Sequence, residues 1–481
     1  MKKVLLLYPQ DSVTKEFMSE RPPLGLAYLG AFLERANHEV KIVDLNLDEL
    51  DNKDIIDYDV IGISFLTPFY TSVQELIKKI RAVKSDVFII LGGAHATLMS
   101  EQVLRETDVQ LVVRGEAEYT FLEILENLDS GDFSSVKGIT YFGKDGKVHH
   151  TESRPLLSNL DELPFPARHL LRIDRYVNVM HNERCTTIMT SRGCPYACAF
   201  CCQVEKRNWR PRSAKNVVDE IEDVYHKYNI KVFYFYDDMV TLDRQRIIDI
   251  SKEVIDRGLK IKWKCASRVN LIDDEMVGWM RKSGCFGINF GVESGDMDIL
   301  KKISKGINLD QVRNAFKIAK KHGIEAKGYF IIGFPWEKEE HVLRTINFSL
   351  TLDADELQYL ILVPLPGTEI WDYAIREGVI DPSNVDWNEF RLVTLDFKNK
   401  VFFTNNISEQ RLLELRKLAY RKAVLHTLKR KIRSGDVKYI YSIVREKWNL
   451  GLGKFVWNMF FSRKSPEPIK ITESFANNMA T

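Results

Sequence analysis

Four of the seven cysteines lie within nine residues of one another, at positions 194–202. Cys194, Cys198 and Cys201 are separated by three and then two residues, so one short loop can converge three thiolates on a cubane. Iron–sulfur clusters are usually held by four cysteines, and three ligands leave one iron open to a substrate or cofactor. A zinc site needs a fourth ligand, which Cys202 supplies poorly because it is adjacent to Cys201. The spacing predicts a 4Fe–4S cluster.

Polar and charged residues follow the apolar runs that come after these cysteines. A zwitterionic amino-acid group needs an acceptor for its ammonium and a donor fork for its carboxylate, and Asp238 and Arg268 are the candidates. Two adjacent buried aspartates would be costly unless a cation neutralised them.

These motifs together resemble the radical S-adenosylmethionine (SAM) superfamily, whose signature is CxxxCxxC with an aromatic residue before the last cysteine, here Phe200. The cofactor contacts that the resemblance implies are Phe200, Asp237, Asp238, Ser267, Arg268, Glu293, Ser294, Ile332 and Gly333. The resemblance implies that residues 236–238 bind the methionine amino group and that 267–268 pair with its carboxylate. It further implies that 291–295 contact the ribose and the methionine end, and that 328–335 lie beside the adenine. The implied chemistry is reductive cleavage of SAM to a 5′-deoxyadenosyl radical.

The residues before the cysteines alternate between short strand-like runs and amphipathic helical runs. Such alternation predicts an α/β, doubly wound, Rossmann-like domain over residues 1–145, whose ligand lies outside the carboxyl ends of the strands. Glycines at those ends allow a backbone to approach a ligand closely, although they also suit tight turns. The candidate contacts at these ends are Ser64, Thr67, Gly92, Gly93, Gly115 and Glu116.

A second strand–helix series occupies residues 184–385, after a polar, proline-containing linker at 146–183. Six such units predict a partial (βα)6, TIM-like barrel with its chemistry at the carboxyl ends of the strands. The expected strands are 186–190, 231–236, 260–265, 287–292, 325–332 and 356–363. Residues 386–481 predict a basic, mostly helical C-terminal domain.

A doubly wound domain before this barrel resembles the cobalamin-binding subclass of the superfamily, through residues 21–26, 92–95 and 114–118. One departure matters, because residues 9–14 stand where an Asp-x-His-x-x-Gly motif would supply a histidine to cobalt. The resemblance therefore implies cobalamin held without a protein ligand to the metal, although some members with this layout bind none. His95 either reaches this ligand or caps a turn.

The resemblance implies a cobalamin-dependent methylase that acts on an unactivated carbon of a small-molecule or lipid-like substrate. An electron donor such as flavodoxin or ferredoxin is the expected protein partner. The alternative enzyme is a radical cyclase or carbon–carbon coupling enzyme acting on a lipid or tetrapyrrole. A non-enzyme alternative is a cobalamin or iron–sulfur sensor that binds nucleic acid. It leaves Asp238, Arg268 and Glu293 without a purpose, so no nucleic-acid partner is expected.

Composition and charge indicate where the protein acts. The cysteine usage indicates a reducing, cytoplasmic setting, and neither a signal peptide nor an apolar run long enough to span a membrane is evident. Residues 411–481 carry 16 Lys and Arg against 5 Asp and Glu in a chain of net charge +2. Residues 446–464 add tryptophan and phenylalanine to this basic tail, which predicts either peripheral contact with anionic lipid or a lid on the barrel.

Overall fold

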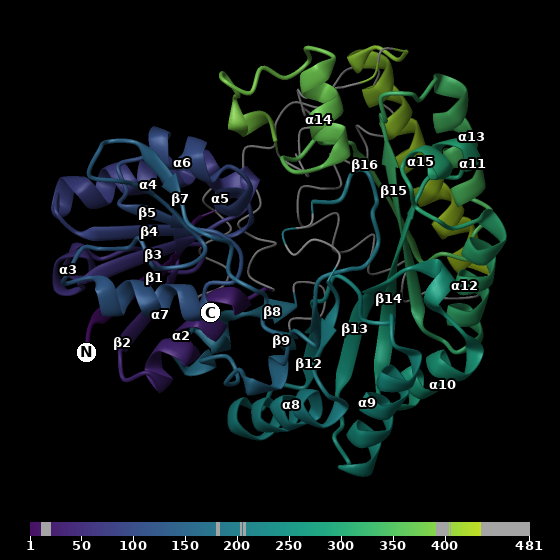
Figure 1. Cartoon of the computed structure of the whole chain (residues 1–481). Helices are drawn as coiled ribbons and strands as arrows, with labels where there is room; N and C mark the ends of the chain where they lie inside the picture. The colour runs from purple at the N-terminus through teal and green to yellow at the C-terminus, as the bar shows by residue number, and fades with distance from the viewer. Residues whose placement is uncertain are drawn as a thin grey trace, which may run out of the picture.

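The computed structural model describes residues 1–10, 21–178, 183–202, 204, 208–390, 404 and 406–433. Two sheets lie side by side, each with its helices, and the chain passes from one to the other near residue 177 (Figure 1). Within the described residues, no helix is both long and apolar enough to cross a membrane.

The first sheet has seven strands in the order β2-β1-β3-β4-β5-β6-β7, of which the first five are parallel. Its apolar β-branched runs are buried on both faces, as parallel sheets require. The strands are β1 (Lys3–Tyr8), β2 (Glu39–Asp44), β3 (Val60–Ser64), β4 (Phe88–Gly92), β5 (Leu111–Val113), β6 (Ile139–Phe142) and β7 (Val148–His150).

Helices cover both faces of this sheet, which confirms the predicted doubly wound architecture (Figure 1). One face carries α2 (Leu24–Arg35) and α7 (Glu118–Asn127). The other carries α3 (Asn52–Asp57), α4 (Tyr70–Val83) and α6 (Ser100–Glu106), with the short α5 (Ala94–Leu98) at the strand ends. The strand order reverses between β1 and β3, which is the point at which such sheets bind ligands.

The second sheet runs β16-β15-β14-β13-β12-β9-β8, and its six strands from β9 onward are parallel neighbours in chain order. This is the predicted partial barrel, whose helices lie on its outer side (Figure 1). The strands are β8 (Val177–Asn178), β9 (Glu183–Ile188), β12 (Val232–Phe235), β13 (Lys262–Ser267), β14 (Cys285–Glu293), β15 (Glu325–Ile332) and β16 (Glu356–Ile361).

The barrel helices begin at the residue types that favour helix starts. The side chains of Ser213, Asp243 and Asp273 accept hydrogen bonds from the first turns of the helices that follow them, which satisfies otherwise unpaired N–H groups. The helices are α8 (Ala214–Tyr228), α9 (Arg244–Asp256), α10 (Asp274–Lys282), α11 (Met297–Lys302), α12 (Leu309–Lys321) and α13 (Glu339–Ser349).

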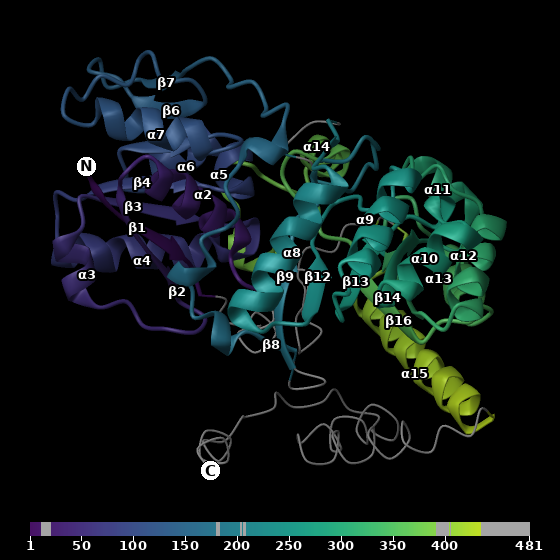
Figure 2. The same ribbon diagram turned by 90° about the horizontal axis from the view of Figure 1, so that it is seen from below.

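The domain limits differ from those expected at three places. β7 pairs with β6, so the first sheet extends past residue 145 into the expected linker. α14 (Glu369–Arg376) and the 3-10 turn η6 (Trp387–Glu389) pack against the first domain, where Trp371 and Trp387 join its core. α15 (Glu409–Arg433) lies against β16 and runs along the barrel (Figure 2).

Candidate active site

The cysteine loop leaves the barrel directly after its first parallel strand. A two-stranded ribbon closes the base of this loop, formed by β10 (Ser191–Arg192) and β11 (Arg210–Pro211). Gly193 begins the loop with φ of 80°, in the left-handed region that glycine enters without strain. The tip of the loop is therefore held at the carboxyl end of the sheet, where barrel enzymes place their chemistry.

Ala199, between the last two cysteines of the signature, fixes the loop to the barrel. Its N–H donates to Ile303 O at 3.0 Å, and its carbonyl accepts from Ile370 N at 3.1 Å. The next residue, Phe200, meets the Phe334 ring edge-on at 6.0 Å. The predicted aromatic position therefore anchors the loop between strand ends.

None of the three signature cysteines forms a disulfide, and besides burial, Cys194 and Cys198 contribute to the raised pKa of the Cys201 thiol. Burial raises the pKa of the Cys201 thiol to about 12, and the charges of Cys198 and Asp238 add to this effect. Such surroundings disfavour thiolates unless a cation is present, and ferric and ferrous iron supply that charge. In the described part of the chain, no three Cys, His, Asp or Glu side chains converge on a single ion. Ligands of a cubane bind different irons and stand further apart, so the loop fits a cluster better than zinc.

Arg268 lies beside this loop, at the end of β13. Its Nη1 is 3.5 Å from Cys198 Sγ, and its guanidinium stacks 3.7 Å above the centroid of the Tyr196 ring. The Arg268 side chain is buried, so its positive charge acts at short range on whatever binds the open iron. The contact of Arg268 with the methionine carboxylate of SAM stays a prediction.

The two aspartates that follow β12 have different surroundings. Asp238 lines a cavity, and loss of hydration near the protein raises the pKa of its carboxyl. Asp237 is buried, and its two oxygens accept hydrogen bonds of 2.5–2.6 Å from Thr190 N, Thr190 Oγ1 and Ser191 Oγ. Asp237 thus supports the first turn of the cysteine loop, rather than making the expected cofactor contact.

Other predicted contacts on the barrel are engaged with protein groups. The Ser267 hydroxyl is 2.6 Å from Thr241 Oγ1, and the Ser294 hydroxyl is 3.0 Å from Thr345 Oγ1. Ile332 is buried at the end of β15, and Gly333 continues the chain with φ of 91°. These two bring backbone to the rim, as expected for a segment beside an adenine ring.

Two residues of this rim were missed in the sequence. Lys305 forms a buried ion pair with Glu293 at 2.7 Å. Glu337 is buried, and its Oε2 accepts from Gly333 N at 2.6 Å and Phe334 N at 3.0 Å. Burial raises the pKa of Glu337 to about 8, and its Oε1 has no hydrogen-bond partner. A glutamate two residues after a Gly-Phe-Pro turn was the available signal.

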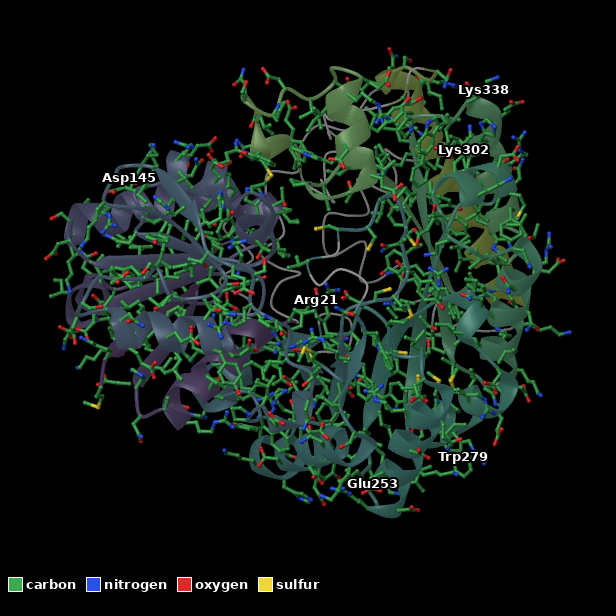
Figure 3. The ribbon with its side chains drawn as sticks, in the orientation of Figure 1. Arg21, Asp145, Glu253, Trp279, Lys302 and Lys338 are labelled. Atoms are coloured by element: carbon green, nitrogen blue, oxygen red, sulfur yellow. The ribbon has the colours of Figure 1, made fainter. Side chains whose placement is uncertain are left out.

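A cavity of about 700 Å³ separates the two domains and is lined by both. This volume lies in the range of small-molecule sites. From the first domain come the predicted Ser64, Gly92, Gly93 and Gly115, and from the barrel come Gly193 and Asp238. Figure 3 places Arg21 at this junction between the domains, and its guanidinium lies 5.4 Å from the centroid of the Tyr236 ring.

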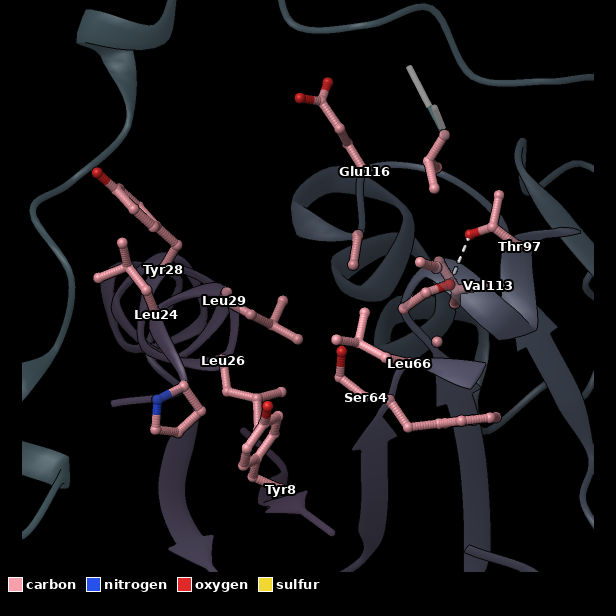
Figure 4. Close-up of a pocket in the computed structure, with 18 of the residues that line it drawn as sticks. Tyr8, Leu24, Leu26, Tyr28, Leu29, Ser64, Leu66, Thr97, Val113 and Glu116 are labelled. Atoms are coloured by element: carbon pink, nitrogen blue, oxygen red, sulfur yellow. Dashed lines mark hydrogen bonds between the residues drawn. The ribbon is translucent and has the colours of Figure 1, made fainter. Parts of the chain in front are cut away.

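The walls on the first-domain side are apolar and formed by closely approaching backbone. In Figure 4, Leu24, Leu26 and Leu29 of α2 lie across the cavity from Leu66 and Val113. Gly93 has φ of 93°, and a Cβ there would lie 2.5 Å from Phe65 O. Gly115 has φ of 79° and open space where its Cβ would be. Such walls fit a broad ligand held by shape, and cobalamin is of that kind.

Thr67 and Glu116, two further candidates for this ligand, contact protein groups, and Glu116 also lines the cavity. The Thr67 hydroxyl lies 3.2 Å from Nδ1 of His95, which is buried. Burial lowers the pKa of His95 to about 3, so its ring is neutral. His95 is not among the residues that line the cavity. Glu116 accepts from Arg192 Nη1 at 2.7 Å and Arg210 Nη1 at 2.9 Å, which ties the first domain to the ribbon.

The family models agree with this division of the chain. The model described as the radical SAM superfamily matches residues 188–349, and the B12 binding domain matches residues 12–125. An uncharacterised methyltransferase of Pyrococcus horikoshii is 38% identical over 421 residues, which cover 85% of this chain and 90% of that protein. The chain belongs to the radical SAM superfamily. Within that family it has the B12-binding N-terminal domain.

Other relatives share the layout at lower identity. The anaerobic magnesium-protoporphyrin IX monomethyl ester cyclase of Rubrivivax gelatinosus is 29% identical, over 77% of this chain and 69% of that protein. The radical SAM methyltransferase TsrM of Kitasatospora setae, solved with cobalamin and a [4Fe-4S] cluster, has the same fold. It superposes with a TM-score of 0.70 at 17% identity, over 88% of this chain and 89% of that one. This family uses a 4Fe–4S cluster and SAM, and its B12-binding domain binds cobalamin.

Proposed function

We propose that this radical SAM enzyme is a cobalamin-dependent methylase that transfers a methyl group to an unactivated carbon of a small molecule. The observation that carries the proposal is the shared cavity, because Gly93 and Gly115 of the B12-binding domain face the same space as Asp238 of the barrel. A methyl donor and a radical generator must reach the same substrate atom, and one cavity between the two domains provides that access.

The cofactors supply the difficult chemistry when bound: the cluster provides an electron to cleave SAM, and cobalamin provides the methyl group. The chain positions them. Cys194, Cys198 and Cys201 hold the cluster, while Asp238 and Arg268 take the ammonium and the carboxylate of SAM. The leucines that line the cavity exclude water, which would otherwise react with a radical.

Anaerobic reconstitution with iron, sulfide and cobalamin tests this proposal. Mass spectrometry then follows SAM products formed on extract from a knockout strain. We expect 5′-deoxyadenosine and S-adenosylhomocysteine in equal amounts, because the methyl group used in each turnover is replaced from a second SAM. Omitting cobalamin should abolish S-adenosylhomocysteine. A substrate-dependent product with 5′-deoxyadenosine alone would contradict methylation.

That last outcome favours the second candidate, a radical cyclase or coupling enzyme on a tetrapyrrole or lipid. The named cyclase of Rubrivivax gelatinosus, 29% identical over most of both chains, supports keeping it. In either case a reduced flavodoxin or ferredoxin is the proposed electron donor in the cytoplasm. Omitting both proteins and replacing them with dithionite measures how much of the activity depends on the donor.

We also propose peripheral contact with anionic lipid through residues 446–464, which lie outside the described residues. The support is compositional: aromatic side chains alternate there with lysine and arginine. Deletion from residue 445 onward should release the protein from anionic liposomes in a flotation assay and leave the cluster intact. If the full chain never floats at low salt, the lid alternative replaces lipid contact.

A further inference from the structure

The turn between α11 and α12 lies behind the proposed SAM site and contacts three of its parts. Ser304 has φ of 54° and Gly306 φ of 65°, so the chain makes two left-handed steps around Lys305. Ile303 O accepts the hydrogen bond from Ala199 N of the cysteine loop. The side chain of Lys305 is buried, which is unusual for lysine without a partner.

The ammonium of Lys305 is paired with Glu293, at the end of β14. Lys305 Nζ lies 2.7 Å from Glu293 Oε1, and both side chains are less than a tenth exposed. Glu293 itself has φ of 69°, and a Cβ on Gly291 would lie 2.6 Å from its Oε1. The backbone is therefore shaped to fit this pair. A buried pair adds little net stability, so its retention calls for another reason.

The backbone carbonyl of Lys305 contacts Arg268, the second residue of the proposed SAM site. Arg268 Nη2 donates to Lys305 O, while Arg268 Nη1 is directed at Cys198 Sγ. One residue thus contacts Glu293 through its side chain and Arg268 through its main chain. These two are the groups proposed for the ribose end and the carboxylate end of SAM.

We propose that Lys305 is a positioning residue for SAM, which sets Glu293 for the ribose and Arg268 for the methionine carboxylate relative to the cluster loop. This inference rests on the proposed function of the barrel rim as the SAM site. Mutation can separate the two contacts that Lys305 makes, one through its side chain and one through its carbonyl. A side-chain substitution removes the contact with Glu293 and leaves the carbonyl that holds Arg268.

The test measures SAM affinity of reconstituted enzyme by equilibrium dialysis. A second ligand is a SAM analogue without the ribose hydroxyls. For Lys305→Met, we expect SAM affinity to fall roughly tenfold or more, the effect of losing a hydrogen bond to a charged group. The affinity for the analogue should change less than about threefold, because the analogue never used Glu293. Lys305→Arg keeps a cation beside Glu293 and should rescue most of the SAM affinity.

A merely structural role makes different predictions. Lys305→Met leaves the Glu293 carboxylate buried without its cation, so that variant can fail to fold. The double variant Lys305→Met, Glu293→Gln removes both charges and should recover thermal stability and iron content. We expect the double variant to bind SAM weakly but the analogue as tightly as the wild type does. A structural role predicts instead that affinity for the analogue falls in Lys305→Met and returns with stability in the double variant.

The outcomes separate the two proposals. If the wild-type enzyme with an intact cluster binds no SAM, the proposed function fails, and the inference about Lys305 fails with it. If the wild-type enzyme binds SAM, and Lys305→Met binds both ligands with unchanged affinity, only the inference is overturned. Equal losses for SAM and the analogue also overturn it, because they place the effect outside the ribose.

Discussion

The rims at the carboxyl ends of the two sheets are built on opposite physical plans. On the first domain, the rim is mostly apolar and contains several glycines, whose backbone angles, such as φ of 93° at Gly93, shape it. On the barrel, the rim carries cysteines and charges, including Asp238, Arg268 and the Glu293–Lys305 pair. A large ligand with a broad face is recognised by shape, whereas a small zwitterion is recognised by fixed charges.

The largest expected effect removes the cluster and leaves the first rim untouched. Cys198→Ala should abolish the visible absorption of the cluster and all 5′-deoxyadenosine formation, because two remaining thiolates cannot hold a cubane. Cys202→Ala is the matched control and should keep both. Corrinoid retention should be the same in the two variants. An active cluster in Cys198→Ala would refute the central assignment.

The converse experiment changes the backbone shape of the first-domain rim at Gly93. A Cβ at Gly93 meets the Phe65 backbone and has an unfavourable φ, so Gly93→Ala should lower stability by roughly 3 kcal/mol. Corrinoid retention should be lost while the cluster absorption of folded protein persists. Gly287→Ala, away from the cavity, places its Cβ in ordinary contact at 3.6 Å from Lys264 Cβ and should change little. Equal behaviour of the two variants in corrinoid binding would remove backbone shape as the cause.

A smaller effect is expected from Glu337, the buried carboxyl under the barrel rim, on how stability depends on pH. The folded pKa of Glu337 is about 8 against 4.5 for the model compound, so the native state keeps a proton that the unfolded state releases. Its contribution to stability is full below pH 4.5 and is lost as the pH rises toward 8, by about 5 kcal/mol in total.

Thermal unfolding of Glu337→Gln between pH 5 and 8.5 measures this effect. The amide still accepts from Gly333 N and Phe334 N but does not titrate, so the melting temperature should depend less on pH than in the wild type. Glu339→Gln is the matched control. Glu339 is a solvent-facing partner of Arg411, and this contact lowers the pKa of the Glu339 carboxyl. If Glu337→Gln and wild type show the same slope, Glu337 is ionised in the native state.

Local sequence patterns predicted both sheets, because apolar β-branched runs alternate with amphipathic helices throughout residues 1–361. They missed β6 and β7 at the edge of the first sheet, and α11, which is only six residues long. The β7 sequence Val-His-His lacks an apolar face. The cluster ligation by the cysteines and the SAM contact of Arg268 follow from motif spacing and stay predictions. The engagement of Glu116 could not be predicted, since its partners Arg192 and Arg210 come from 76 and 94 residues away. Asp237 and Asp238 are adjacent and chemically identical, so only the folded loop distinguishes their surroundings.

The packing of η6 on the first domain has a consequence for biosynthesis. Trp387 packs edge-on against Tyr70 and His95 in the core, yet it is made about 300 residues after them. At 5–20 residues per second, the ribosome needs roughly 15–60 s to supply it. During that interval the emerged N-terminal sheet has an uncovered aromatic face. We therefore expect nascent chains arrested before residue 387 to recruit chaperones, and chains released after residue 390 to escape them.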